Sequence, residues 1–484
     1  MKVIITGAGM VGITLARHLT QDKNEVILIE ADEERARYAS NRLDCLVIHD
    51  EGNNLTVLEE AGIGSADVLI CVTGSDEINI IICGIAAVRN PNLLKIARVR
   101  NDDYVRLNRS AIVRTANAGT HKENRLLGVD YFAHPNVEAA ITALNAIEHN
   151  AAGDVMSFAG TNYELGCIDI KTGSRFDGLN LKDYRRIVSD ETLVTLIERG
   201  GEYIIPSGQT TLAAGDHVYI LANEDEMDKL FEMGGNSKSF IRKIGVIGGG
   251  ELGSLIVEGL LFHGESINET KIKSFFSFFR GLILKNNRKV VIIEQDYALC
   301  KELAARFPEA LTLNEDISDE HFIHEEHING LDLIITATGN QELNIITALY
   351  LKSAGVKRAI AVVASDGYAA IARRLGIDVV IPIKSVVVDS ILSRLLGGGV
   401  RSIHRLGGGV ISLFEIKVSP QMPIAEKPIN EFKLSSGGLV MLVRRGGESF
   451  IPHGEYTFKI EDHVIIAAKK GSKKEIEKLF GVQL

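Results

Sequence analysis

Short runs of nearly continuous apolar residues alternate with amphipathic stretches in the first part of the chain. The predicted strands are Lys2–Thr6, Glu25–Glu30, Cys45–His49, Asp67–Thr73, Leu94–Val99 and Val129–His134. Helical patterns fill the gaps, for example over Glu33–Leu43 and Glu77–Val88. Strands that lack polar alternation are typical of a parallel sheet covered by helices on both faces. The pattern therefore predicts an α/β domain with a doubly wound, Rossmann-like parallel sheet.

The same pattern returns in the second half of the chain, which indicates an internal duplication. KVIITGAGMVG at the start reappears as KIGVIGGGELG, so that Gly7 corresponds to Gly248. The strands predicted for this second copy are Ile244–Ile247, Val290–Glu294, Leu311–Asn314, Asp332–Thr338, Arg358–Val363 and Val379–Pro382.

A smaller module follows each of these domains. Residues 198–222 and 444–468 are identical at 13 of 25 positions with a constant offset. Short, glycine-broken strands are predicted at Leu165–Lys171, Thr192–Glu198, Tyr203–Pro206 and His217–Ala222, followed by a helix at Asp225–Met233. We therefore expect small α+β modules and four domains, at 1–140, 145–235, 241–398 with an insertion at 263–289, and 402–484.

Composition narrows the class of protein. Lys plus Arg number 53 against 63 for Asp plus Glu, and this net charge of -10 argues against a dedicated nucleic-acid binder. There is no run of 18 apolar residues, so we expect no membrane span, and the N-terminus has no signal-peptide pattern. Five widely spaced cysteines without a C-x-x-C pair suggest reduced, mostly buried thiols in a cytoplasmic protein.

The clearest chemical signal is a G-x-G-x-x-G motif between the first strand and the first helix. Gly7 permits a tight turn, Gly9 lets backbone N–H groups approach a pyrophosphate, and Gly12 lets the helix pack closely on the sheet. The amino end of the helix attracts phosphate. Glu30, at the end of the next strand, can accept hydrogen bonds from ribose hydroxyls. With Ala31 and Asp32 following and no cation at hand, NAD(H) or an adenine nucleotide is favoured over NADP. The alternative is that these glycines only shape a turn.

Further candidates lie after later strands of the first copy. Thr73 and Gly74 follow the fourth strand at the carboxyl edge of the sheet, where they could contact the nucleotide. We expect Asp76 and Glu77 to cap the next helix. Arg98 and Arg100 alternate on the fifth strand, so they face either a ligand phosphate or an acidic partner on a helix.

The second copy departs from the first. It has Gly248, Gly250 and Gly253 in the same motif, but its acid, Glu294, lies 46 residues after Gly248 because of the insertion. That insertion contains six Lys or Arg and two Glu from Gly264 to Lys289, with several Phe, so it either meets a membrane protein or lipid or packs as an excursion. Its fifth strand carries Ala361, Val362 and Val363 in place of the arginines, so a phosphate-rich ligand fits this site less well.

No catalytic or metal-binding residues are predicted. His321, His324 and His327 are spaced by three, but their segment matches a surface helix. His217 and His463 occupy equivalent strand ends in the small modules. A dehydrogenase needs a proton donor beside the nicotinamide, and the small modules are poor in such groups. Binding without turnover is the more economical interpretation, an NAD-dependent oxidoreductase is the alternative, and a scaffold that needs no ligand is a third class.

Together GAGMVG with its following acid, LEEAG, DVLICVTGSDEIN, KIARVR and IIPSG…AGDHV resemble regulator of potassium conductance (RCK) domains. The order of the four domains is similar to that of the TrkA family of Trk potassium-uptake regulatory subunits, from Met1 to about Phe480. The resemblance implies a non-enzymatic, peripheral cytoplasmic protein. It implies a ring, usually a homotetramer or dimer of dimers, beneath a membrane potassium-translocating subunit. It also implies binding of NAD(H), and of ATP or ADP, to gate ion uptake.

Carried over to this sequence, the first site comprises Gly7, Ala8, Gly9, Met10, Val11, Gly12, Glu30, Thr73, Gly74 and Arg98, and the second Gly248, Gly250, Gly253 and Glu294. After the third strand, His49 to Gly52 and Asn314 to Asp316 lack the leading glycine of the family, which puts contacts near the adenine end in question. The helix Asn136–His149, with Val137, Ala140, Ile141, Leu144 and Ile147 at helical spacing, matches the family's crossover helix.

Overall fold

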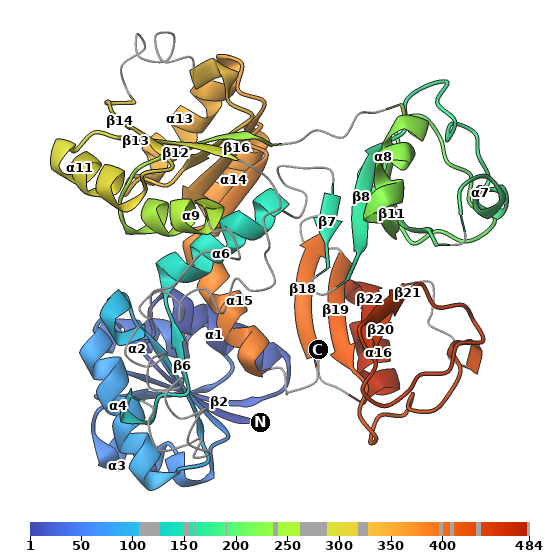
Figure 1. Cartoon of the computed structure of the whole chain (residues 1–484). Coiled ribbons are helices and arrows are strands. Elements are labelled where there is room, and N and C mark those ends of the chain that lie inside the picture. The colour runs from blue at the N-terminus through green and yellow to red at the C-terminus, as the bar shows by residue number, and fades with distance from the viewer. Residues whose placement is uncertain are drawn as a thin grey trace. The chain divides into compact units, whose positions relative to one another are not determined.

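The structure is a computed structural model that describes residues 1–105, 126–148, 155–158, 161–189, 191–235, 241–261, 288–317, 328–395, 400–406, 411–431 and 437–481. These residues form four β-sheets (Figure 1). The chain divides into two compact units, Met1–Asn145 with Arg242–Leu395, and Ala146–Ile241 with Leu396–Leu484. Among the described residues, no helix has the length and apolar content needed to cross a bilayer.

The first large sheet has six parallel strands in the order β3-β2-β1-β4-β5-β6. Chain order reverses beside β1, which places a crevice at the carboxyl ends of β1 and β4. The strands are β1 (Lys2–Thr6), β2 (Glu25–Glu30), β3 (Leu46–His49), β4 (Val68–Cys71), β5 (Leu94–Arg98) and β6 (Tyr131–Ala133). The helices are α1 (Met10–Gln21), α2 (Glu33–Ser40), α3 (Leu55–Glu60), α4 (Asp76–Arg89) and α6 (Pro135–Glu148).

The second large sheet repeats this topology in the order β14-β13-β12-β15-β16-β17. Its strands are β12 (Lys243–Ile247), β13 (Lys289–Glu294), β14 (Leu311–Asn314), β15 (Leu333–Thr336), β16 (Arg358–Val363) and β17 (Val379–Pro382). Its helices are α9 (Glu251–Leu261), α11 (Tyr297–Arg306), α13 (Gln341–Ser353), α14 (Asp366–Arg374) and α15 (Ile383–Leu395).

The predicted doubly wound α/β fold is confirmed in both copies, with small differences at strand ends. The fourth strand ends at Cys71 and not at Thr73. The reason is that the Thr73 N–H donates to Asn79 Oδ1, 2.9 Å away, and so leaves the strand ladder. The predicted insertion and the segment of His321, His324 and His327 lie outside the described residues, apart from Arg288 and Lys289 at the end of the insertion.

The last helix of each large domain packs on the other copy. Val387, Val388 and Ile391 of α15 belong to one buried cluster with Leu15 and Leu19 of α1. In return, the Leu144 side chain of α6 lies against Gly259 of α9. A Cβ built on Gly259 would lie 2.2 Å from the Leu144 side chain. The crossover helix thus joins the two copies inside one chain (Figure 1). Of its predicted apolar residues, Val137, Ala140, Leu144 and Ile147 are buried, and Ile141 is partly exposed.

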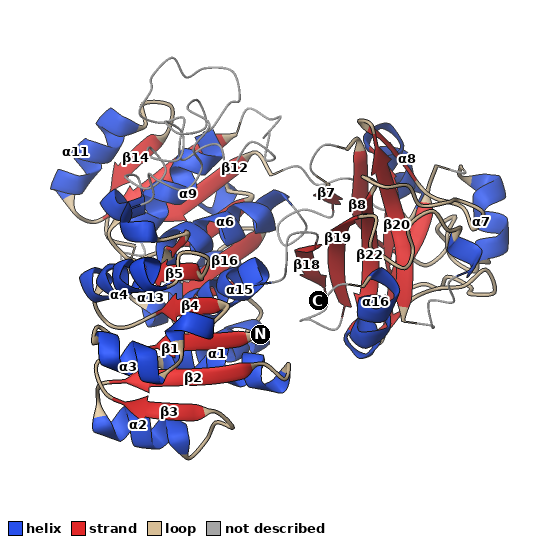
Figure 2. Cartoon of the chain, turned by 90° about the horizontal axis from the view of Figure 1, so that it is seen from below, coloured by secondary structure: helices blue, strands red, loops and turns tan. Residues whose placement is uncertain are grey.

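The two small sheets are antiparallel and have five strands each, in the orders β10-β9-β11-β8-β7 and β18-β19-β22-β20-β21 (Figure 2). The first contains β7 (Val155–Ser157), β8 (Tyr163–Asp169), β9 (Leu193–Arg199), β10 (Glu202–Ile204) and β11 (His217–Asn223), with helices α7 (Leu181–Ile187) and α8 (Glu224–Met233). The second contains β18 (Val400–Leu406), β19 (Ile411–Lys417), β20 (Gly438–Arg445), β21 (Glu448–Phe450) and β22 (His463–Lys469), with helix α16 (Lys473–Phe480).

Each small sheet has two apolar faces. One face covers the module's own core, for example Ile168 and Phe231 in the first module. The other face meets the other small sheet, with Leu165 and Tyr219 in the same buried cluster as Leu413. The edge strand β7 and helix α7 were not predicted from sequence because both are short and lack a clear period.

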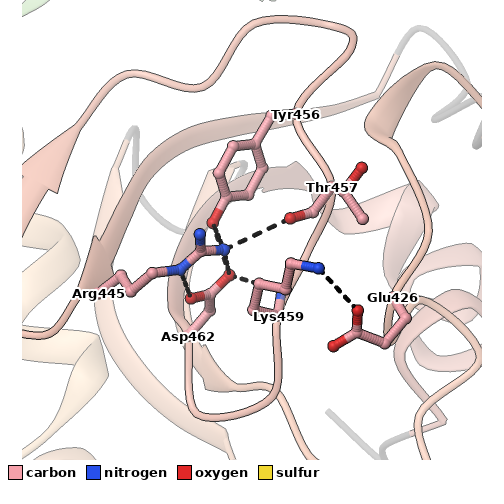
Figure 3. A network of polar contacts seen from close by, with 6 residues as sticks. All are labelled: Glu426, Arg445, Tyr456, Thr457, Lys459 and Asp462. Carbon is pink, nitrogen blue, oxygen red and sulfur yellow. Dashed lines mark hydrogen bonds and ion pairs between the residues drawn. The ribbon is translucent and has the colours of Figure 1, made fainter.

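A buried aspartate fixes the turn before the last strand of each small module, and Figure 3 shows the one in the second module, Asp462. Asp462 is fully buried and accepts hydrogen bonds from Arg445 Nε at 2.7 Å, Tyr456 Oη at 2.6 Å and Lys459 N at 2.8 Å. Burial raises the pKa of Asp462, but the hydrogen bonds from Arg445 and Tyr456 outweigh it, so the pKa lies below its ordinary value. Arg199 and Asp216 repeat this pair in the first module.

Exchange of the crossover helices predicts that a change in the second copy destabilises the first. Ile391→Ala removes a fully buried side chain from the cluster around α1 and should cost about 2–5 kcal/mol. Hydrogen exchange in residues 10–21 should accelerate, as measured by mass spectrometry. Leu375→Ala, at a side chain in the same copy that is 56% exposed, serves as the control. Unchanged exchange in residues 10–21 of Ile391→Ala would contradict the packing described.

Candidate nucleotide-binding site

The glycine turn after β1 brings its first and last glycines into contact. Gly7 has a φ of +101°, which side-chain-bearing residues rarely adopt, and its N–H donates to Ile29 O at 2.8 Å. A Cβ on Gly12 would lie 1.9 Å from Gly7 O. Gly248 and Gly253 repeat both features, with a φ of +94° and a distance of 1.8 Å. Gly12 was predicted to let the helix pack closely on the sheet. Its closest neighbour is instead the Gly7 carbonyl of the same turn, and the sheet lies further away.

The middle glycine has a different role. Gly9 is the N-cap of α1, and a Cβ built on it would meet no atom within 4 Å. The first turn of α1 contains no acidic residue. No side chain caps this helix start, so the first N–H groups and the partial positive charge at the amino end of α1 are left for a ligand, as an anion site requires.

Glu30 ties this turn to the second strand. Its side chain is buried, and its carboxylate accepts hydrogen bonds from Ala8 N and, at 3.0 Å, from Asp32 N. Glu294 does the same in the second copy, from Gly249 N at 2.7 Å and Asp296 N at 2.9 Å. Each carboxylate oxygen retains a second lone pair. Glu30 can therefore still contact a ribose as predicted. It also holds the glycine turn in place, a structural role that the sequence did not reveal.

A cavity of about 360 Å³ lies at the carboxyl edge of the first large sheet. It brings together seven of the ten predicted first-site residues, namely Gly7, Gly9, Val11, Glu30, Thr73, Gly74 and Arg98. Ala8 and Met10 line a neighbouring surface hollow with Gly9, and Gly12 is buried beneath the turn. The cavity volume lies in the range of small-molecule sites.

Arg98 supplies a positive charge to this cavity. One guanidinium nitrogen, Nη2, donates to Thr73 O at 2.6 Å. Its Nε is buried and has no hydrogen-bond partner among the described residues. Burial, and then the nearby charge of Arg100, lower the pKa of Arg98 from its ordinary value. Since a guanidinium in a protein stays protonated, Arg98 is a desolvated cation with a donor left over, which is suited to an anionic ligand.

Arg100 also lines the cavity, but β5 ends at Arg98. The backbone beyond the strand is held by Asp76, whose Oδ2 accepts from Arg100 N at 2.7 Å and Asn101 N at 2.9 Å. The predicted capping by Asp76 and Glu77 is therefore wrong. The N-cap of α4 is Ser75, whose Oγ accepts from Ile78 N at 3.2 Å.

Asn79 is a site residue that sequence reasoning missed. It is fully buried; its Oδ1 accepts from Thr73 Oγ1 at 2.7 Å, and its Nδ2 donates to Arg98 O at 2.9 Å. Asn344 joins Thr338 and Val362 O in the same way in the second copy. The signal was available, because an asparagine stands six residues after the threonine in both copies.

The prediction that no cation lies near a ribose 2′-phosphate is wrong because of Arg35. It lies in the first turn of α2 and lines the same cavity as Glu30 and Ala31. A cation is therefore at hand near the ribose end, and charge alone does not exclude NADP. Glu51, Gly52 and Asn53, which follow the third strand, also line the cavity, although this loop lacks the leading glycine of the family.

The second copy has a hollow of about 600 Å³ in the corresponding place, lined in part by Gly250, Thr338 and Gly339. Gly248, Gly253 and Glu294 shape the turn beneath it. Two differences make it more negative. Val362 O accepts a hydrogen bond from Asn344 as Arg98 O does from Asn79, so Val362 takes the position of Arg98 and the cation is missing. Glu251 opens α9 where the first copy has Met10.

Glu251 is held by residues of the first copy. Its carboxylate accepts from Asn136 Nδ2 at 2.8 Å and lies 3.2 Å from His134 Nε2. Asn136 belongs to α6 and lines the second hollow. The second hollow is thus built from both copies and has a carboxylate at its helix terminus.

Comparison with known proteins places these features in a family. The TrkA-N domain matches residues 3–118 and 279–383, and the TrkA-C domain matches residues 168–233 and 413–481. The Trk system potassium uptake protein TrkA homolog 1 of Methanosarcina mazei is 30% identical over 487 residues, which cover 99% of this chain and 100% of that protein. The Trk system potassium uptake protein TrkA of Halomonas elongata is 27% identical, over 100% and 99% of the two chains.

Solved structures share the fold at low sequence identity. The GsuK channel bound to NAD aligns with a TM-score of 0.51 at 15% identity, covering 99% of this chain and 78% of that chain. The crystal structure of the GsuK RCK domain gives a TM-score of 0.51 at 16% identity, covering 99% and 94%.

The glycine geometry predicts opposite effects for two similar substitutions. Gly12→Ala puts a methyl group against the Gly7 carbonyl and should destabilise the protein by about 1–3 kcal/mol in urea unfolding. Gly9→Ala points a methyl group into open space and should leave the free energy of unfolding within about 0.5 kcal/mol of the wild type. Equal stabilities for the two variants would contradict the turn geometry.

Proposed function

The chain belongs to the TrkA family of potassium-uptake proteins, and from that premise we propose that its first large domain binds NAD(H) to regulate a Trk-type membrane subunit. The RCK-type resemblance is confirmed by family matches in both halves. A role in regulating potassium transport follows from this membership. We propose which nucleotide binds, where it binds and how the chains assemble.

The choice of site rests on one observation, the position of Arg98. The partly buried Arg98 has a buried Nε donor without a hydrogen-bond partner among the described residues, in a cavity whose other wall is the amino end of α1. A diphosphate across this gap would meet the N–H groups near Gly9 and the cation at Arg98. Glu30 would hold the adenosine ribose at the end of β2. Thr73 and Gly74 would contact the ligand at the end of β4.

NAD(H) suits this cavity as a dinucleotide, and ADP or ATP shares its adenosine diphosphate part. The GsuK channel, which has the same fold, is described as bound to NAD. In the second hollow, Val362 and Glu251 replace the cation and the neutral helix start. A polyphosphate there would meet repulsion at the helix terminus. We therefore propose that the first site is the principal nucleotide site.

The proposed role is binding without turnover. The described residues that line the first cavity include no His, Lys, Tyr or Cys, the usual proton donors apart from carboxylic acids. This supports a sensing role over an NAD-dependent oxidoreductase. Steady NADH consumption with a small carbonyl substrate would favour the oxidoreductase instead.

Coupling would pass through the exchanged crossover helices. Ligand binding that favours one arrangement of the large domains shifts the population toward it. Because α6 and α15 each pack on the other copy, a change in the first domain reaches the second. We propose that domains 1–140, 145–235, 241–398 and 402–484 form a homotetrameric ring or dimer of dimers. This ring would lie at the cytoplasmic face of the membrane subunit.

Arg98→Gln tests the site directly. Loss of a charge-assisted hydrogen bond, about 1.5–3 kcal/mol, should weaken NADH binding roughly 10- to 100-fold in calorimetric titration of the full chain. NAD, NADPH, ADP and ATP titrated in parallel would rank the ligands. Arg89→Gln, at an exposed side chain whose Nε lies 3.1 Å from Glu59 Oε1, is the matched control. Equal affinity of Arg98→Gln and wild type would remove the assigned site.

A further inference from the structure

The first small module carries a cluster of three different metal-ligating side chains at the end of its sheet. Cys167 and Asp169 stand on β8, and His217 opens β11. In the antiparallel register His217 faces Asp169, and Tyr219 faces Cys167. The ligating atoms of Cys167, Asp169 and His217 all lie within 4.8 Å of one another. A cross-strand pair and its diagonal neighbour therefore converge on one point.

The donor set has a definite chemical preference. A thiolate, an imidazole nitrogen and a carboxylate oxygen are the ligands of Zn²⁺ and related borderline cations, and three protein ligands leave a fourth position open. Hard cations such as Mg²⁺ and Ca²⁺ prefer oxygen alone. The His217 and Asp169 side chains are 50% and 62% exposed, so an ion can reach the cluster from solvent.

The second module offers an internal comparison. His463 opens β22, and its Nδ1 lies 2.8 Å from Glu415 Oε1. There the carboxylate also accepts from Arg444 Nη2 at 3.2 Å. Arg444 faces His463 in the sheet register. The second module thus supplies its own cation to the histidine and carboxylate.

In the first module that cationic position is acidic. Glu198 faces His217 where Arg444 faces His463. The Glu198 carboxylate accepts from Tyr203 Oη at 2.8 Å and is thereby held beside the cluster. Asp169 likewise faces His217 where Lys417 faces His463, and Cys167 takes the register position of Glu415. The first module therefore lacks both cations of the second and gathers thiol, imidazole and carboxylate donors instead. Such a group attracts a divalent cation.

We propose that Cys167, Asp169 and His217 bind one divalent transition-metal ion of the Zn²⁺ class in each chain. The ion takes the place between the Asp169 carboxylate and the His217 ring, which contact each other in its absence. Binding converts the Cys167 thiol to a thiolate, and the proton passes to solvent. The site joins β8 to β11 at the rim of the face that meets the other small sheet. It is independent of the nucleotide site.

Sequence patterns alone indicate no metal site because the ligands are far apart. His217 lies 48 residues from Asp169, and no C-x-x-C or H-x-x-x-H motif marks it. Antiparallel pairing of β8 with β11 creates the cluster. Of the chain's five cysteines, Cys71, Cys83 and Cys300 are buried, whereas Cys167 and Cys45 are partly exposed.

Cobalt titration of the full-length, chelator-treated protein tests the proposal. Co²⁺ should bind one per chain with a thiolate-to-cobalt charge-transfer band, and Zn²⁺ should displace it with loss of the band. Cys167→Ser should abolish the band, and His217→Ala should lower the affinity for Co²⁺ at least about 10-fold. Cys45→Ser, at the other partly exposed thiol, and His463→Ala, at the equivalent strand start, are the controls.

Folding and metal binding are separated by a second measurement. Without metal, thermal unfolding of His217→Ala should differ from that of the wild type by no more than the loss of one exposed ion pair with Asp169. Zn²⁺ should raise the midpoint of the wild type only. If Cys167→Ser fails to fold, Asp169→Asn gives the same test at another exposed ligand. A wild-type protein without a thiolate band, or a band that survives in Cys167→Ser, would overturn the proposal. NADH affinity is expected to be unchanged in all these variants.

Discussion

The closure of the glycine turn onto itself is the constraint on which the candidate site depends. The space between Gly7 O and Gly12 admits no Cβ, and Glu30 draws the intervening Ala8 amide toward β2. Together these contacts fix the amino end of α1 at the edge of the sheet, where Gly9 and Val11 line the cavity. The second copy obeys the same constraint through Gly248, Gly253 and Glu294. The turn is therefore a shared scaffold, and what each copy binds depends on the side chains around it.

Duplication allows each scaffold to be compared with its own relative inside one chain. In the large domains, the first copy has the Arg98 cation and a neutral helix start, whereas the second has Val362 and the carboxylate of Glu251. In the small modules the difference is reversed in sign, because Glu198 of the first stands where Arg444 neutralises the second. The backbone pattern is preserved in both comparisons while the local charge changes. These charge differences support the proposed anionic ligand in the first large domain and the proposed cation in the first small module.

Much of the fold could be predicted because buried parallel strands and a glycine motif leave clear local patterns. The ends of β1 and β2 and the positions of Gly7, Glu30 and Thr73 followed from such patterns, whereas the crossover helix followed from the family resemblance. The remainder depends on contacts between distant segments. Asn79 holds Thr73 through side-chain hydrogen bonds, Arg35 enters the cavity from the first turn of α2, and His217 meets Asp169 across an antiparallel pair. Nothing in the local sequence around any one of these residues specifies its partner.

Hydrogen exchange with and without NADH, followed by mass spectrometry on the full chain, tests the central claim most directly. The amide groups near Gly9 and in the segment around Arg98 are predicted to become protected when NADH is added, because the diphosphate would occupy the space between them. Residues 248–253 should change less, since Glu251 stands at the corresponding helix terminus. Protection confined to the second glycine turn, or none in residues 7–12 at saturating NADH, would contradict the account.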